Sequence, residues 1–137
     1  MVITVLVVED DEFLRSLMTH LLKGAGYDVH LAADGEEALR IFESRSFDLV
    51  ITDILMPKHD GFQFISEIRA RNSEVKIIAI SGGSYVRDYL ELANKFGADC
   101  CLSKPFTHEE VLETISLVLG PESTATADSR AWGAKNV

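Results

Sequence analysis

Five short apolar runs alternate with five amphipathic stretches, and this alternation constrains the fold more than any other feature of the chain. The runs are rich in β-branched residues, as expected for strands buried on both faces, and they cover residues 3–8, 27–31, 47–52, 75–80 and 100–102. Amphipathic helices are expected to begin near residues 13, 34, 60, 84 and 107. Strands joined through helices pair in parallel by right-handed crossovers. We therefore expect an α/β fold, a doubly wound five-stranded parallel sheet of (βα)5 type with helices on both faces.

Local signals mark the ends of several helices. The first helix is expected to face the core with Phe13, Leu14, Leu17, Met18, Leu21 and Leu22. Asp34 can cap the second helix with Glu37 three residues on, and Thr107 and Glu110 have the spacing of a capping box. Gly120 and Pro121 end the last helix. We expect one domain over residues 1–120.

Composition changes after the last helix and limits the function classes. Residues 121–137 are small and polar apart from Trp132, which predicts a flexible C-terminal tail with no further DNA-binding or catalytic domain. The net charge of −9 is unlike that of a nucleic-acid binder, and no direct contact with nucleic acid is expected. A transmembrane run and a signal peptide are both lacking, so we expect no membrane insertion. The adjacent Cys100 and Cys101 fit a reducing, cytoplasmic location.

Polar residues collect where the predicted strands end, which is where sites lie in open α/β sheets. Glu9 and Asp10 follow the first strand, with Asp11 and Glu12 after them, and Asp53 ends the third. Ser81 and Gly82 follow the fourth strand, and Lys104 follows the fifth. In the strand order 2-1-3-4-5, common in this fold class, strands 1 and 3 are neighbours. That order brings Glu9 and Asp10 beside Asp53.

Such a cluster suits phosphoryl chemistry. Three neighbouring carboxylates repel one another, and an all-oxygen set favours Mg²⁺, with Mn²⁺ as an alternative. The Asp53 carboxylate can attack phosphorus to form an aspartyl phosphate. Lys104 can neutralise phosphoryl oxygens, Ser81 can donate a hydrogen bond, and Gly82 lets a backbone N–H approach the phosphoryl group closely.

Each residue alone also has a plainer interpretation. Acidic residues between a strand and a helix commonly cap the helix, which would account for Asp11 or Glu12 and even for Glu9 and Asp10. A single lysine such as Lys104 is usually solvated. An unpaired Asp53 at the end of an apolar strand would be costly and is harder to dismiss. The hypothesis depends on all of these residues following the appropriate strands.

These residues lie in stretches that resemble the response-regulator receiver domain of two-component signalling. The similar stretches are residues 5–11, 48–57 with Asp60 and Gly61, 78–82, and 97–106. The resemblance covers roughly residues 3–119. It implies a flavodoxin-like fold, similar to that of chemotaxis regulators, and a phosphorelay module in which Asp53 accepts a phosphoryl group from a histidine kinase or histidine phosphotransfer protein.

The resemblance also implies roles for individual residues. Glu9, Asp10, Asp53 and the backbone carbonyl of Leu55 would hold Mg²⁺. Ser81 matches the hydroxyl that moves on phosphorylation, Lys104 matches the family's lysine, and Pro105 would follow a cis peptide bond. The expected docking surface for a downstream protein comprises the helix 84–96, the strand 100–102 and the helix 107–119. The protein would act as a monomer or a phosphorylation-dependent dimer, and as an enzyme only in self-phosphotransfer and autodephosphorylation.

Two positions depart from the usual family pattern. Cys101 stands where the family usually has Tyr or Phe, three residues before the lysine. The thiol is too small for the aromatic part of the switch, so signalling is expected to use mainly the segment 81–85. The alternative is that Cys101 is only a small strand residue with no part in signalling. Leu55 and Gly83, each two residues beyond a key side chain, cannot orient a water molecule. A long-lived aspartyl phosphate is therefore expected.

Other function classes fit less well. A phosphatase with an aspartyl nucleophile commonly has a second acid two residues on, where this chain has Leu55. A flavin carrier needs a phosphate-binding loop after the first strand, where residues 9–12 are all acidic. A receiver-like domain that no longer takes phosphate would not need the full set of Asp10, Asp53, Ser81 and Lys104. The chain can be a single-domain regulator or the receiver segment of a larger regulator or hybrid kinase.

Overall fold

The computed structural model describes residues 2–56, 59–82 and 86–120, and it contains the predicted parallel sheet. Its five strands are β1 (Thr4–Val8), β2 (Asp28–Ala32), β3 (Leu49–Asp53), β6 (Lys76–Ser81) and β7 (Cys100–Ser103). They lie in the order β2-β1-β3-β6-β7, and all pairings are parallel. This order is the predicted 2-1-3-4-5 when the strands of this sheet are counted along the chain.

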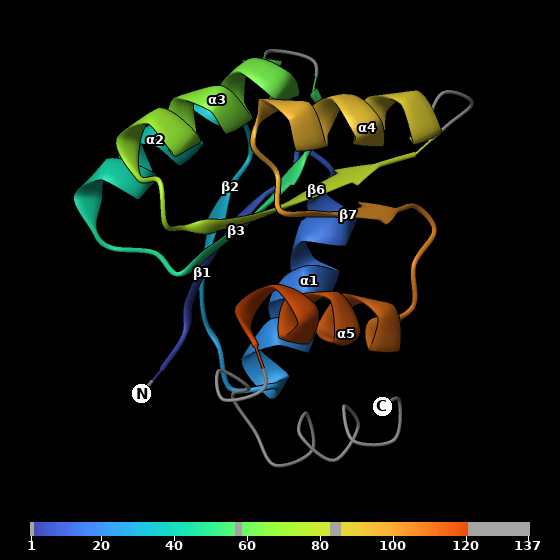
Figure 1. Ribbon diagram of the computed structural model, residues 1–137. Coiled ribbons are helices and arrows are strands. Elements are labelled where there is room, and N and C mark those ends of the chain that lie inside the picture. Colours follow the sequence, from blue (N-terminus) through green and yellow to red (C-terminus); the bar gives the residue numbers. More distant parts are fainter. Residues whose placement is uncertain (1, 57–58, 83–85, 121–137) are drawn as a thin grey trace.

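Helices cover both faces of the sheet (Figure 1). On one face lie α1 (Glu12–Gly24) and α5 (His108–Leu119), and on the other lie α2 (Gly35–Ser44), α3 (Gly61–Arg71) and α4 (Val86–Phe96). Alternate residues of each central strand enter opposite cores. In β1, Leu6 and Val8 pack on the side of α2 and α3, whereas Val5 and Val7 pack on the side of α1 and α5. The continuous apolar runs in the sequence reflect this burial on both sides.

The predicted helix caps are confirmed. The side chain of Asp34 accepts a hydrogen bond from the Glu37 N–H at 2.8 Å. Thr107 and Glu110 form a complete capping box at the start of α5. Asp60 caps α3 and Asp11 caps α1, each through its side-chain carboxylate. These caps satisfy backbone N–H groups that have no partner inside the helix.

The prediction that Phe13 faces the core is wrong, because its side chain is 75 % exposed. Met18 and Leu22 are buried, and Leu14 and Leu21 pack against the same core, so these four residues define the buried face of α1. Successive side chains on a helix are about 100° apart, which places Phe13 well outside that face. The side chain of Leu17, near the edge of the buried face, is 38 % exposed.

A small feature that we did not predict follows Asp53. Two-residue strands β4 (Leu55–Met56) and β5 (His59–Asp60) pair in antiparallel fashion before α3. Gly61 then lies directly against the backbone of Ile54, where a Cβ atom would come within about 2.5 Å of the Ile54 Cα. The absence of a side chain at Gly61 therefore lets α3 start immediately beside the end of β3.

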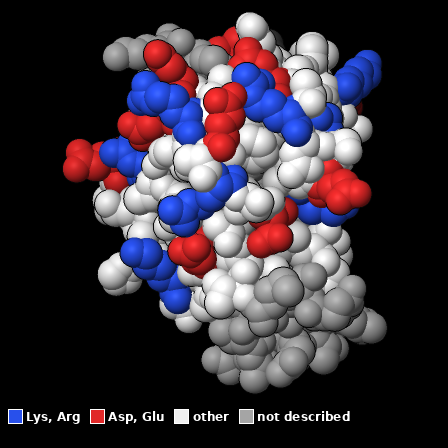
Figure 2. All heavy atoms as spheres, turned by 90° about the vertical axis from the view of Figure 1, so that its left-hand side faces the viewer, with Lys and Arg blue, Asp and Glu red and all other residues white. Residues whose placement is uncertain are grey.

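Several predictions fall outside the described residues. The flexible tail at 121–137 with Trp132, the role of Gly83, and most of the segment 81–85 belong to this group. Within the described part of the chain, no helix combines the length and the hydropathy needed to cross a membrane. Figure 2 shows one face of the molecule, on which Lys and Arg side chains are interspersed with Asp and Glu. Neither sign of charge dominates that face.

Candidate phosphoryl-transfer site

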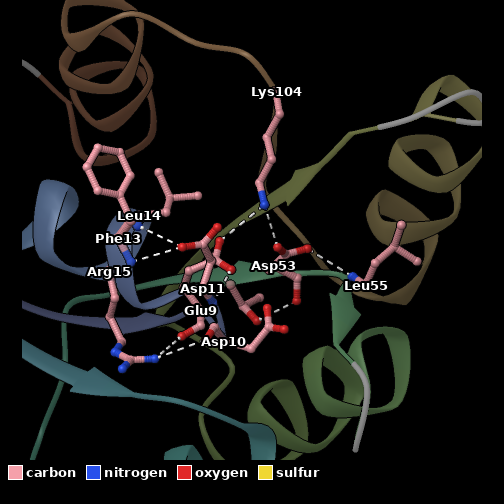
Figure 3. A network of polar contacts seen from close by, with 10 residues as sticks. Glu9, Asp10, Asp11, Phe13, Leu14, Arg15, Asp53, Leu55 and Lys104 are labelled. Carbon is pink, nitrogen blue, oxygen red and sulfur yellow. Dashed lines mark hydrogen bonds and ion pairs between the residues drawn. The ribbon is translucent and has the colours of Figure 1, made fainter.

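Asp53 is the last residue of the central strand β3, and its side chain lies at the carboxyl edge of the sheet. The residue is only 4 % exposed. One carboxylate oxygen, Oδ1, accepts a hydrogen bond from the Leu55 N–H at 2.9 Å, and Oδ2 accepts one from Lys104 Nζ at 2.7 Å (Figure 3). Both oxygens are therefore held in defined positions.

Glu9 and Asp10 lie beside Asp53 because β1 and β3 are paired in register. Val8 is opposite Thr52, so the residues that follow Val8 are level with Asp53. Oxygen atoms of the three carboxylates all lie within 4.8 Å of one another. Glu9 is buried and Asp10 is exposed. The predicted juxtaposition of the three acids is thus present.

Lys104 reaches this cluster from beyond the end of β7. Its backbone N–H donates to the Ser81 carbonyl at 2.8 Å, which extends the pairing of β6 and β7. Its Nζ donates to Asp53 and, at 3.3 Å, to Glu9 Oε1. Partial burial alone would lower the pKa of Lys104, but the hydrogen bond and charge of Asp53, with Glu9, raise the pKa above its usual value. The Lys104–Pro105 peptide bond is cis.

The electrostatics of Glu9 show that the cluster favours additional positive charge. The pKa of Glu9 is raised to about 7 as the net result of several effects, of which burial is the largest. The hydrogen bond from the Asp11 N–H and the charge of Lys104 lower this pKa, whereas the charge of Asp53 raises it. Two buried acids thus share one partly exposed ammonium group. Carboxylate oxygens are suitable ligands for a hard divalent cation, so these residues fit a metal ion.

Ser81 and Gly82 lie on the next strand and the residue after it. Ser81 is fully buried, and its Oγ atom has no hydrogen-bond partner within the described part of the protein. A buried hydroxyl without a partner is costly and is available to an incoming acceptor. At Gly82, an added Cβ would lie 3.1 Å from Lys104 Cβ, so glycine permits the close approach of the lysine side chain.

An open cleft of about 530 Å³ connects these groups. Residues at or just beyond the ends of β1, β3, β6 and β7 line it, namely Glu9, Asp10, Asp11, Asp53, Leu55, Gly82, Lys104 and Pro105. Every residue predicted for the site except Ser81 is in this lining, and Ser81 precedes Gly82. Asp11 lines the cleft as well as capping α1, so its two interpretations are compatible. We did not predict a role for Arg15, whose guanidinium group hydrogen-bonds to the backbone of Glu9 and Asp10.

Comparisons with known proteins agree with this fold and show the family. The response regulator receiver domain family matches residues 5–116. The transcriptional regulatory protein RprY of Bacteroides fragilis is 39 % identical over 84 % of this chain and 48 % of its own length. The alkaline phosphatase synthesis transcriptional regulatory protein PhoP of Bacillus subtilis is 33 % identical over 91 % of this chain and 52 % of its own. The structure of the chemotaxis protein CheY4 of Vibrio cholerae superposes with a TM-score of 0.81 at 33 % identity, over 87 % of this chain and all of that one.

The fold, the acidic cluster and these matches define a phosphoryl-responsive signalling module, and the chain belongs to the response regulator receiver domain family. Phosphorylation on an aspartate is typical of this family, whose members are regulatory modules that interact with histidine kinases. The chain spans about half the length of the curated relatives that it matches.

Proposed function

We propose that Asp53 is the phosphoacceptor of a two-component phosphorelay. A carboxylate oxygen of Asp53 forms a bond to phosphorus while the N–P bond of a phosphohistidine breaks, and the histidine nitrogen keeps the electron pair. The phosphohistidine belongs to a histidine kinase or a histidine phosphotransfer protein. The observation that carries this proposal is the pairing of the buried Asp53 carboxylate with Lys104 at 2.7 Å, next to two further acids in an open cleft.

Different surrounding residues bind the cation and neutralise the charge of the phosphoryl oxygens. Glu9, Asp10, Asp53 and the Leu55 carbonyl hold Mg²⁺, or Mn²⁺, which supplies positive charge to the phosphoryl oxygens when bound. Lys104 moves its hydrogen bonds from the carboxylates to a phosphoryl oxygen. The Gly82 N–H approaches the phosphoryl group from the β6 side, where no side chain blocks it. Water later hydrolyses the aspartyl phosphate, so the only reactions of the domain are its own phosphorylation and dephosphorylation.

Phosphorylation is read out through Ser81. Its Oγ atom, buried and without a partner in the described structure, hydrogen-bonds to the phosphoryl group and draws the start of the β6–α4 segment with it. Cys101, which packs half-buried against the core under α4, is too small to report this movement as an aromatic ring would. Signalling therefore passes mainly through the β6–α4 segment to the face formed by α4, β7 and α5, where a downstream protein docks.

A comparison of wild type with Cys101→Tyr tests this route. Phosphorylation-linked NMR shift changes on the α4–β7–α5 face are expected in both proteins. If those changes occur only in the Tyr variant, the signal requires an aromatic residue and the proposed route is wrong.

The relatives suggest the wider setting. They are named transcriptional regulatory proteins, and the part that matches this chain is about half of their length, which supports a receiver that controls a further region or a separate protein. The receiver itself contacts proteins rather than nucleic acid, as a monomer or a phosphorylation-dependent dimer. Its cytoplasmic location is proposed from the adjacent thiols of Cys100 and Cys101.

The phosphoacceptor is tested with acetyl phosphate and Mg²⁺, followed by intact-mass spectrometry. Wild type is expected to gain one phosphoryl group that hydroxylamine removes, and Asp53→Asn is expected to gain none. Asp48→Asn is the matched control, because Asp48 lies just before the opposite end of β3 and binds the Thr4 N–H. A hydroxylamine-labile phosphoryl group on Asp53→Asn, or none on wild type, would overturn the proposal.

A further inference from the structure

We infer that Arg15 is a positioning residue for the cation site, holding the backbone that presents Glu9 and Asp10. This inference rests on the proposed function, because the cation site matters only if Asp53 takes up phosphate with Mg²⁺. Arg15 contributes no ligand atom. It acts by fixing the orientation of the Glu9 and Asp10 carboxylates.

The acidic pair lies on backbone that belongs to no regular element. β1 ends at Val8 and α1 begins at Glu12, so Glu9 and Asp10 lack the hydrogen-bond ladder that fixes Asp53 in β3. The Glu9 N–H still bonds to the Ala32 carbonyl at 3.1 Å, but beyond it the chain turns away from the sheet. The orientation of both carboxylates must therefore be set by other contacts.

Arg15 provides such a contact from the first turns of α1 (Figure 3). Its Nη1 atom donates to the Glu9 carbonyl at 2.9 Å and lies 3.4 Å from the Asp10 carbonyl. One guanidinium group thus bridges the two successive carbonyls of the pair. The Arg15 N–H donates to the Asp11 carbonyl at 2.9 Å, which ties the same residue to the next position.

The other end of the segment is fixed independently of the Arg15 side chain. The Asp11 side chain caps α1 through the Phe13 and Leu14 N–H groups, and the Asp11 N–H donates to Glu9 Oε2 at 3.1 Å. Among the described residues, the side chain of Arg15 is the donor that bonds the carbonyls of Glu9 and Asp10. Removing it frees the backbone at the two candidate ligands and leaves the helix cap in place.

Positioning and charge make opposite predictions for the loss of this side chain. A positive charge near a cation site repels the cation, so if Arg15 acted only by its charge, Arg15→Ala would bind Mg²⁺ more tightly. If Arg15 orients the ligands, Arg15→Ala binds Mg²⁺ more weakly, by about tenfold, as is usual for residues that orient metal ligands. The direction of the change thus separates the two explanations.

The experiment titrates Mg²⁺ into wild type, Arg15→Ala and Arg15→Lys and follows amide shifts by NMR. We expect the Kd of the Ala variant to rise about tenfold and that of the Lys variant to rise less, since Lys keeps the charge and one donor but loses the planar fork. Arg40→Ala is the matched control, because it removes the same charge from an exposed position on α2, and its Kd is expected to stay within about twofold of wild type.

A second readout separates positioning from a general loss of structure. At saturating Mg²⁺, phosphoryl uptake from acetyl phosphate by Arg15→Ala is expected to return to within about threefold of wild type, since bound cation restores the ligand geometry. Uptake that stays low at saturating Mg²⁺ would mean a structural defect and overturn the inference. If Arg15→Ala does not fold, the test uses Arg15→Lys instead. A Kd of Arg15→Lys for Mg²⁺ that is equal to or lower than that of wild type then overturns the inference.

The outcomes also distinguish this inference from the proposed function. If wild type binds Mg²⁺ and is phosphorylated on Asp53, but Arg15→Ala binds Mg²⁺ as well as wild type or better, only the role of Arg15 is wrong. If wild type neither binds Mg²⁺ nor takes up a phosphoryl group, the proposed function is wrong and the inference falls with it.

Discussion

The ammonium group of Lys104 lies 2.7 Å from a carboxylate oxygen of Asp53, although the two residues are 51 positions apart in the sequence. The same ammonium group also reaches Glu9 at 3.3 Å. Lys104 therefore places a positive charge in direct contact with both buried acids, which are also two of the candidate metal ligands. Its two effects can be separated because they act in opposite directions.

Lys104→Met is expected to bind Mg²⁺ more tightly and to take up phosphate more slowly. Loss of the ammonium group removes a cation that competes for Asp53 and Glu9, but it also removes a donor for the phosphoryl oxygens, which is expected to cost about 100-fold in rate. Mg²⁺ titration by NMR and phosphoryl uptake from acetyl phosphate measure the two effects. Lys76→Met, at the exposed opposite end of β6, is the control. Weaker Mg²⁺ binding by Lys104→Met would contradict this account.

Gly61→Ala is expected to destabilise the protein by about 2 kcal/mol, because the new methyl group would overlap the Ile54 backbone between Asp53 and Leu55. Urea unfolding measures the change. Gly24→Ala is the matched control, since a Cβ at Gly24 meets nothing within 4 Å, and this change at the end of α1 is expected to stabilise by about 0.5 kcal/mol. Equal free energies of unfolding for the two variants would show that the contact with Ile54 is unimportant.

The sheet and the juxtaposition of most site residues could be predicted from the sequence. The sheet follows from the apolar runs, and the site follows from polar residues that come directly after predicted strands. The apolar runs are short and rich in β-branched residues, which indicates buried strands. The carboxyl ends of parallel strands lie at one edge, so Asp10 and Lys104 were both expected near Asp53 once the strand order was assumed. The order itself came from the common topology of the fold class and from the family resemblance.

The features that were missed have weak sequence signals. The exposure of Phe13 depends on which face of α1 meets the sheet, and an exposed apolar residue next to Leu14 in the sequence cannot be told from a buried one by residue type. The β4–β5 pair is only two residues long on each side. Arg15 binds backbone carbonyls, which every residue has, so its partners cannot be recognised from residue types.

Tyr27 is expected to make stability fall at high pH. Burial raises the pKa of its phenol above the usual value of 10, and the residue is only 5 % exposed. As the pH rises through about 10, the unfolded chain loses this proton before the folded protein does, so the unfolded state is favoured. Tyr27→Phe lacks this effect. Urea unfolding from about pH 8 to about pH 11, roughly two units below to one unit above the usual phenol pKa, should show the stability difference shifting in favour of the variant above about pH 10. A constant difference between the two proteins would contradict the prediction.

Leu55 is expected to prolong the life of the aspartyl phosphate. Its side chain is 50 % exposed and lines the cleft next to Asp53, where it offers an attacking water molecule no hydrogen bond. Leu55→Asn and Leu55→Glu place polar atoms at that point and are expected to speed dephosphorylation about tenfold, less than the roughly 100-fold or more of a full general base, because these side chains only orient the water molecule. Decay of the phosphorylated proteins after removal of acetyl phosphate gives the rates. Leu117→Asn, at an exposed position on α5, is the control and should decay as wild type does. Faster decay of wild type than of both Leu55 variants would mean that the apolar side chain does not protect the phosphoryl group.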